Sequence, residues 1–228
     1  MHVGLNDLNK FKVIFLFIPL LILIKENCFA QEKKINFVLS AGINYSGLKY
    51  NSRAIYWKDT KFQFNNNVSI GIEYLLSENI STQILLRYSK LSYNIVYDEK
   101  SDGPYPDGIA IHSIIKHNYL FLPIHIKYYI KRQIFLLTGV ETGYLVSSKS
   151  VDYIYDGSTW KWDLLNSLKK INLTVDLGVG VEKKIGKIKI LYFVVYAHGI
   201  TTISQKYYHS NEWRTREIYN NLGIKISL

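Results

Sequence analysis

Apolar and polar side chains alternate along most of this chain, and a period of two is the pattern of β-strands with one apolar face. The seven residues 222–228 show it clearly, with Leu222, Ile224 and Ile226 on one face and Gly, Lys and Ser on the other. Helical periodicity is faint after residue 31. The alternation predicts eight strands, at residues 35–46, 67–75, 81–96, 116–129, 134–147, 170–182, 188–203 and 216–228.

The connections between these segments alternate between short and long. Tight turns are expected at 77–79, 131–133 and 183–187, and extended polar loops at 48–61, 98–113, 148–167 and 204–213. Short periplasmic turns and long outer loops are typical of outer-membrane barrels. The pattern therefore predicts an all-β fold, a single antiparallel up-and-down transmembrane β-barrel of about eight strands. Its final strand is expected to pair with the first and close the sheet.

Alternation alone does not decide which face is inside, because a soluble lipocalin-like barrel has the same period with apolar groups inward. The positions of the glycines favour the membrane barrel over the soluble one. Gly42, Gly71, Gly139, Gly178 and other glycines share the face opposite to the isoleucines and valines. Glycine makes room for crowded side chains in the narrow interior of about eight strands, whereas on a wet surface it only weakens a strand. The glycine face is predicted to line the interior.

Charged residues share that inner face, where they avoid the cost of pointing at lipid. Because both signs are present, they can pair inside the barrel. The predicted interior polar network consists of Glu73, Arg87, Lys127, Glu141, Asp176 and Glu182. The opposite face carries a continuous apolar belt, including Ile70, Leu122 and Val179, which requires surrounding hydrocarbon.

Two features of the segment 116–129 admit two interpretations each. Pro123 lacks a backbone donor and is expected to mark a β-bulge, with a gating kink as the alternative. His125 and Lys127 share the inner face, where they could form a proton-responsive or anion-holding site. The preferred interpretation is a buried structural pair matched to Glu141 or Glu182.

The first 30 residues have the pattern of a secretory signal peptide. Lys10 and Lys12 precede the uncharged run 13–24, and Cys28-Phe29-Ala30 serves as the small-residue cleavage site. Twelve residues at ~1.5 Å each span about 18 Å, which is too short for a retained membrane helix. We expect cleavage after Ala30, which gives a signal peptide at 1–30 and a barrel domain at 31–228. Cys28, the only cysteine, leaves with the signal, so no disulfide is expected.

The mature chain is basic. Of 28 basic and 18 acidic residues, the signal holds three and two, which leaves 25 against 16. This balance suits a surface in contact with anionic lipid headgroups. The expected partners are outer-membrane lipid and lipopolysaccharide, with envelope or surface proteins as further candidates. Nucleic acid is not expected, because the basic residues are dispersed and the chain is exported.

No residue pattern predicts catalysis, a cofactor or a metal. His112, His117 and His125 are five and eight residues apart, which is not the spacing of a metal box. Ser113 beside His112, or the pair Ser147-Ser148, could serve a lipid-modifying barrel hydrolase, but nothing in the sequence orients a base toward a hydroxyl. We therefore expect a protein that is not an enzyme.

Aromatic residues gather in the predicted loops. Near strand ends they would form the girdle at the headgroup level, and at loop tips they could bind a protein or glycan. The turn-forming stretch 102–108 would hold Tyr105 outward. The candidates for loop recognition are Tyr105, Trp160, Trp162 and Trp213.

Several strands resemble those of the outer-membrane barrel family typified by PorT, within the wider OmpA/OmpX-like barrels. The likeness is carried by residues 119–129 (YLFLPIHIKYY), 137–145 (LTGVETGYL) and 175–182 (VDLGVGVE), with 41–46 and 198–200 in support. Val195 departs from the family, which carries a basic residue there. The resemblance implies a Gram-negative outer-membrane barrel, and PorT itself is associated with protein secretion.

The sequence thus predicts an integral barrel of the bacterial outer membrane that acts as a structural or interaction protein through its extracellular loops. A small passive channel and a secretion-associated component are the alternatives. A lipid-modifying enzyme is less favoured. Size argues against the channel, because side chains fill an interior of about eight strands.

Overall fold

The alternating segments form long antiparallel strands in the computed structural model, which describes residues 35–50, 57–97, 110–131, 133–154, 157–203 and 213–228. The predicted signal peptide and Tyr105 lie outside these ranges. The strands are β1 (Ile35–Tyr50), β2 (Trp57–Leu75), β3 (Ile80–Tyr97), β4 (Ala110–Lys131), β5 (Ile134–Ile154), β6 (Thr159–Asp163), β7 (Ile171–Ile185), β8 (Ile188–Gly199) and β9 (Trp213–Ser227). A short 3₁₀ helix, Leu165–Ser167, precedes β7. Within the described ranges, no helix has the length and hydropathy needed to cross a bilayer.

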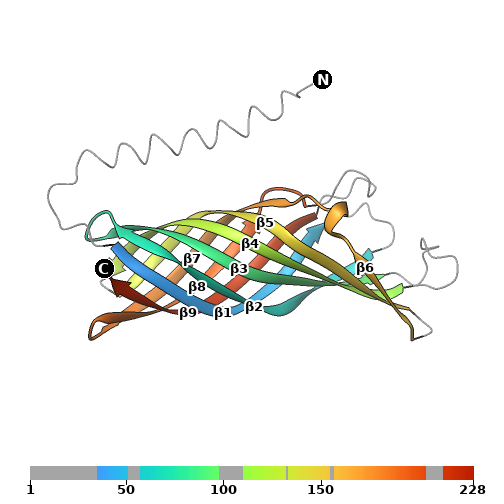
Figure 1. The fold of residues 1–228 in the computed structure, drawn as a ribbon, viewed down its shortest axis with the longest axis horizontal. Coiled ribbons are helices and arrows are strands. Elements are labelled where there is room, and N and C mark those ends of the chain that lie inside the picture. Colours follow the sequence, from blue (N-terminus) through green and yellow to red (C-terminus); the bar gives the residue numbers. More distant parts are fainter. Residues whose placement is uncertain (1–34, 51–56, 98–109, 132, 155–156, 204–212) are drawn as a thin grey trace, which may run out of the picture. The chain divides into compact units, whose positions relative to one another are not determined.

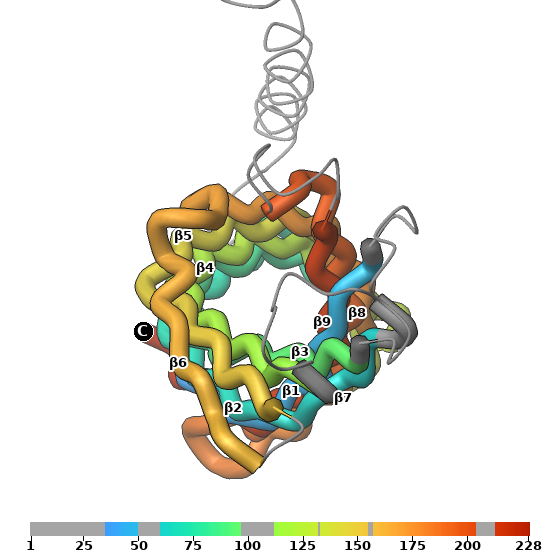
Figure 2. Tube along the Cα trace, turned by 90° about the vertical axis from the view of Figure 1, so that its right-hand side faces the viewer, coloured from blue at the N-terminus to red at the C-terminus, as the bar shows by residue number. Residues whose placement is uncertain are grey.

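All the strands except β6 form a closed ring. The order is β4-β3-β2-β1-β9-β8-β7-β5, and β4 pairs with β5 to complete the circle, which Figure 2 shows end-on. The first and last strands pair over their whole length, from Asn36 opposite Ser227 to Tyr50 opposite Trp213. The predicted eight-stranded transmembrane barrel, closed by its last strand, is confirmed.

The two ends of the barrel differ. Short connections join β2 to β3, β4 to β5 and β7 to β8 at the end where the C-terminus lies (Figure 1). The turn at Gly186-Lys187 leaves only two residues between strands, and Gly186 has a φ of +60°, which glycine adopts without strain. Because short turns face the periplasm, the opposite end is extracellular.

Strands extend further toward the extracellular end than the sequence indicates. Parts of the predicted loops 48–61, 98–113 and 148–167 belong to β1, β2, β4, β5 and β6, so their prediction as loops was wrong there. In contrast, β8 ends at Gly199 and not at residue 203. Antiparallel pairing continues beyond the bilayer, where neither face needs to be apolar. The alternation of apolar and polar residues is therefore lost in these parts of the chain, although the strands continue.

The two faces of the ring have opposite character. Apolar side chains cover the outside, and Ile43, Leu177 and Leu222 are 55%, 66% and 62% exposed. The predicted belt residues Ile70, Leu122 and Val179 are also on this outer face. A buried mixture of polar, charged and aromatic side chains fills the inside. A surface so apolar requires hydrocarbon around it.

The interior has an apolar layer at its extracellular end. We call this cluster the upper apolar layer: Leu48, Leu91, Tyr93, Ile95, Ile115, Tyr119, Phe121, Leu145, Leu168, Ile203 and Trp213. Charged groups lie below it, nearer the periplasmic turns.

Pro123 does not mark a bulge. Its register with Glu141 on β5 is continuous, and the register of β4 with β3 is the same before and after it. Pairing with β3 is interrupted between Ile124 and Phe121. The missing backbone donor therefore leaves a gap in the ladder and inserts no extra residue.

Candidate functional site

The interior charges form two groups, and the middle group is built around Arg87 of β3. Its guanidinium donates to Glu141 of β5 at 2.6 Å and to Glu217 of β9 at 2.7 and 3.1 Å. The same group lies over the rings of Phe121 and Tyr219, 4.5 and 4.3 Å from their centroids. All three charged side chains are buried. Paired carboxylates and ring faces together compensate the desolvation of the guanidinium.

Neutral donors complete the coordination of the two glutamates. Asn44 and Ser89 donate to Glu217 at 2.6 and 3.1 Å, and the hydroxyl of Tyr219 donates to Glu141 at 2.9 Å. These bonds join β1, β3, β5 and β9 across the interior. The network therefore fixes strands on opposite sides of the ring.

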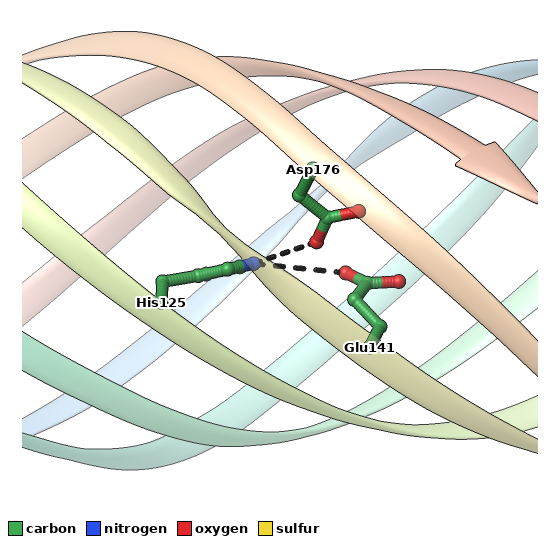
Figure 3. A group of neighbouring side chains, drawn as sticks. All are labelled: His125, Glu141 and Asp176. Carbon is green, nitrogen blue, oxygen red and sulfur yellow. Dashed lines mark hydrogen bonds and ion pairs between the residues drawn. The ribbon is translucent and has the colours of Figure 1, made fainter. Parts of the chain in front are cut away.

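His125 of β4 and Asp176 of β7 belong to the same middle group (Figure 3). The Nε2 atom of His125 lies 2.7 Å from Oδ2 of Asp176 and 3.9 Å from Oε1 of Glu141. All three side chains are fully buried. One imidazole nitrogen therefore faces two carboxylates from the two strands that follow it around the ring.

The lower group lies toward the periplasmic turns and is centred on Lys225 of β9. Its ammonium contacts Glu73 and Glu182, each at 2.6 Å. Lys127 contacts Glu73 at 2.6 Å, and Lys189 reaches Glu182 at 2.8 Å from a partly exposed position. The carboxylates in this group are matched by at least as many ammonium groups.

The structure divides the six residues of the predicted network between the two groups. Arg87, Glu141 and Asp176 are in the middle group, and Glu73, Lys127 and Glu182 are in the lower one. Lys127 was expected to pair with Glu141 or Glu182, but it pairs with Glu73.

Glu217, Tyr219 and Lys225 were not among the predicted interior residues, although all three share the strand face of Gly223. The convergence of His125, Glu141 and Asp176 was not predicted, because spacing along one segment carries no information about neighbouring strands.

The serine and histidine residues considered for hydrolysis do not come together. Ser113 is buried and donates to Asp152 at 2.5 Å, whereas the ring of His112 stacks on Tyr153. Adjacent residues of a strand point to opposite faces, so Ser113 and His112 cannot act on one substrate atom. Ser148 bonds His117 at 2.8 Å among the aromatic side chains of the upper apolar layer, where both are buried.

Two of the tryptophans proposed for recognition lie on β6. This strand forms a hairpin with the upper part of β5, beyond the section of β5 that pairs with β7. Trp160 and Trp162 are 41% and 45% exposed, with ring centroids 6.1 Å apart. Trp213, in contrast, is only 8% exposed and packs in the upper apolar layer. The prediction that Trp213 is a loop recognition residue was wrong, because β9 begins at that residue and turns it inward.

Residues 29–205 match a family model described as an outer membrane protein beta-barrel domain. The chain belongs to this family. As an outer-membrane barrel protein, it resides in the bacterial outer membrane, in agreement with its apolar exterior. A comparison with curated proteins gave no match.

Solved barrels are similar to the chain at low sequence identity. Ail, the attachment invasion locus protein of Yersinia pestis, solved in complex with the heparin analogue sucrose octasulfate, is 10% identical, with 86% of this chain and 100% of that chain covered and a TM-score of 0.44. OprG of Pseudomonas aeruginosa is 10% identical, with 86% and 97% covered and a TM-score of 0.43. The outer membrane protease OmpT of Escherichia coli is 11% identical, with 87% and 99% covered and a TM-score of 0.45. At these sequence identities and TM-scores, none of the three structures bears on the function of this chain.

Proposed function

We propose that this barrel is a non-enzymatic interaction protein that binds an envelope or surface protein through the β5–β6 hairpin. The observation that carries this proposal is the exposed tryptophan pair on β6. Tryptophan is enriched at the centres of protein interfaces, where its large area is buried at little cost in conformational entropy. Two such side chains on one exposed strand offer an anchor for a partner.

The hairpin geometry supports this role. Trp160 lies opposite Asp152 and Trp162 opposite Ser150, so both rings are on one face of the hairpin. Within the described part of the chain, β6 pairs with β5 alone, and its other edge is open. An open edge can accept a further strand. A partner could combine backbone pairing with burial of the indoles.

The lipid environment supplies a second set of contacts. Lys149, Lys161, Lys169 and Lys170 are exposed around the hairpin and the start of β7. Lysines at this level attract the phosphates of lipopolysaccharide. We regard lipopolysaccharide as the surrounding medium and a protein as the specific partner.

The likeness to PorT is a finer proposal than the family assignment. Its support is limited to the strand motifs, and three of them contribute His125, Lys127, Glu141 and Asp176 to the interior. Such motifs preserve packing and charge pairing in a barrel. We therefore do not assign a role in secretion.

The proposed function can be tested by cross-linking on intact cells that express the protein from a plasmid. The double variant Trp160→Ala/Trp162→Ala is compared with Tyr128→Ala/Tyr192→Ala, in which two exposed tyrosines of the barrel wall are replaced. We expect the tryptophan variant to lose the cross-linked protein and the tyrosine variant to keep it. Recovery of the same proteins with both variants would refute binding through β6.

A further inference from the structure

Three metal-ligating side chains converge in the middle of the barrel. His125, Glu141 and Asp176 each offer one ligand atom, and these atoms all lie within 4.8 Å of one another (Figure 3). They come from β4, β5 and β7, which are consecutive around the ring. One imidazole with two carboxylates is a donor set suited to a divalent transition metal.

A glycine makes this convergence possible. Gly139 of β5 is paired with His125 on one side and with Asp176 on the other. A methyl group at Gly139 would come within 2.8 Å of the imidazole Cδ2 atom and would also meet the carbonyl oxygen of Ile124. The imidazole therefore occupies the space that a side chain at position 139 would fill. This brings Nε2 of His125 within reach of Asp176.

The carboxylates are oriented by contacts to their other oxygens. Arg87 binds Oε2 of Glu141 at 2.6 Å, and Thr174 donates to Oδ1 of Asp176 at 3.2 Å. Oδ2 of Asp176 is directed at Nε2 of His125, and Oε1 of Glu141, which also accepts from the hydroxyl of Tyr219 at 2.9 Å, lies 3.9 Å from the same nitrogen. Hydrogen bonds of this kind hold metal-binding carboxylates in place in known sites.

Charge balance provides an independent argument for a cation. The middle group contains the carboxylates of Glu141, Asp176 and Glu217 but only one guanidinium, that of Arg87. With a neutral imidazole, its net charge is −2. The lower group has no such deficit, since Lys127, Lys189 and Lys225 face Glu73 and Glu182. Uncompensated charge is costly in a closed interior, and one divalent ion would bring the middle group to neutrality.

We propose that His125, Glu141 and Asp176 bind one divalent ion of the zinc class inside the barrel. Ligands at 2.0–2.2 Å in a tetrahedral site lie about 3.4 Å apart. The distances of 2.7 and 3.9 Å from Nε2 to the two carboxylate oxygens bracket this value, so small side-chain shifts complete the site. The ion would tie β4, β5 and β7 together. Because all three ligands are buried, it enters during folding.

The test uses residues 31–228 refolded from urea into detergent micelles with zinc chloride, calcium chloride or a chelator. Free metal is removed, the folded barrel is washed with chelator, and bound metal is measured by mass spectrometry. We expect about one zinc ion per barrel, no calcium, and a higher melting temperature after refolding with zinc. A barrel refolded in zinc that holds no more metal than the chelated sample would overturn the proposal, and protons would then balance the charge.

The variant His125→Gln and the control His117→Gln identify the site. His117 is also a buried histidine of β4, but its partner is a serine. We expect His125→Gln to lose roughly tenfold or more of the bound zinc and His117→Gln to keep it. Equal zinc in both variants would contradict the assignment.

If His125→Gln fails to fold, the unaltered barrel refolded with cobalt tests whether the three ligands bind a metal. Visible d–d absorption of a tetrahedral nitrogen and oxygen site is expected. Its absence from a folded barrel refolded in cobalt would also overturn the proposal. The tryptophan pair is not involved, so this result is independent of the proposed function.

Discussion

Arg87 is the residue on which the interior most depends. It is fully buried, it pairs with two glutamates, and it lies between two aromatic rings. The guanidinium can satisfy both carboxylates because its donors form a planar fork, which a lysine ammonium lacks. Removing this charge would leave the middle group with carboxylates alone.

Replacing Arg87 with Met is therefore expected to destabilise the barrel by about 3–5 kcal/mol, the range for breaking a buried ion pair. Lys183→Met is the control, because Lys183 is an exposed residue of β7, and its effect should be within about 0.5 kcal/mol. Urea unfolding in phospholipid vesicles measures both. Equal midpoints for the two variants would show that the Arg87 pairs do not stabilise the barrel.

The sequence identifies which residues face inward, but not which of them meet. Strand parity places Arg87, Glu141 and Asp176 inside, since they share a face with the glycines. Their partners depend on the stagger between strands around the ring, which no single segment records. Arg87 meets Glu217 across 130 positions of the chain. For the same reason, His125 was predicted to pair with a glutamate, and its shortest contact is with Asp176.

At the scale of elements, the central part of each strand was predictable and the extracellular ends were not. Lipid imposes alternation between residues such as Ile70 and Gly71, and the turns supply glycine and polar residues. Beyond the bilayer no such selection acts. The polar β6, Thr159–Asp163, was therefore predicted as part of a loop.

The pairing of β1 with β9 is the element that closes the barrel, and its register can be tested by cross-linking. Asn36 and Ser227 are directly paired, and their side chains are hydrogen-bonded at 2.8 Å. Paired residues of antiparallel strands have Cα atoms about 4.5–5.5 Å apart, which suits a disulfide. In residues 31–228, which contain no cysteine, Asn36→Cys/Ser227→Cys should form an intramolecular disulfide on oxidation.

The control for this cross-link is Asn36→Cys/Asn221→Cys. Asn221 is paired with Gly42, six residues further along β1, or about 20 Å away. This pair should stay reduced. Disulfide formation in the control, or none in the test pair, would show that the closing register is different. A gel without reductant, followed by mass spectrometry of the linked peptides, reads out both.

At the scale of the whole molecule, the filled interior argues against a pore. The upper apolar layer and the two charged groups occupy successive levels of the barrel, and their side chains are mostly buried. An eight-stranded ring has an interior just wide enough for such side chains.

We therefore expect no stable current steps when the purified barrel is incorporated into planar bilayers, with a general porin as the positive control. Insertion is checked independently by protease protection in vesicles of the same lipid. Reproducible single-channel steps from a barrel shown to be inserted would contradict the filled interior and would restore the channel alternative.

The chain folds as a barrel with an apolar exterior and a charged interior, and this arrangement requires lipid around it. The most direct test dilutes residues 31–228 from urea into buffer with detergent micelles and into buffer alone. Far-ultraviolet circular dichroism and the migration of unheated samples on denaturing gels report folding. We expect a β-rich, heat-modifiable species only with micelles. A monomeric, folded protein in buffer without detergent would contradict it.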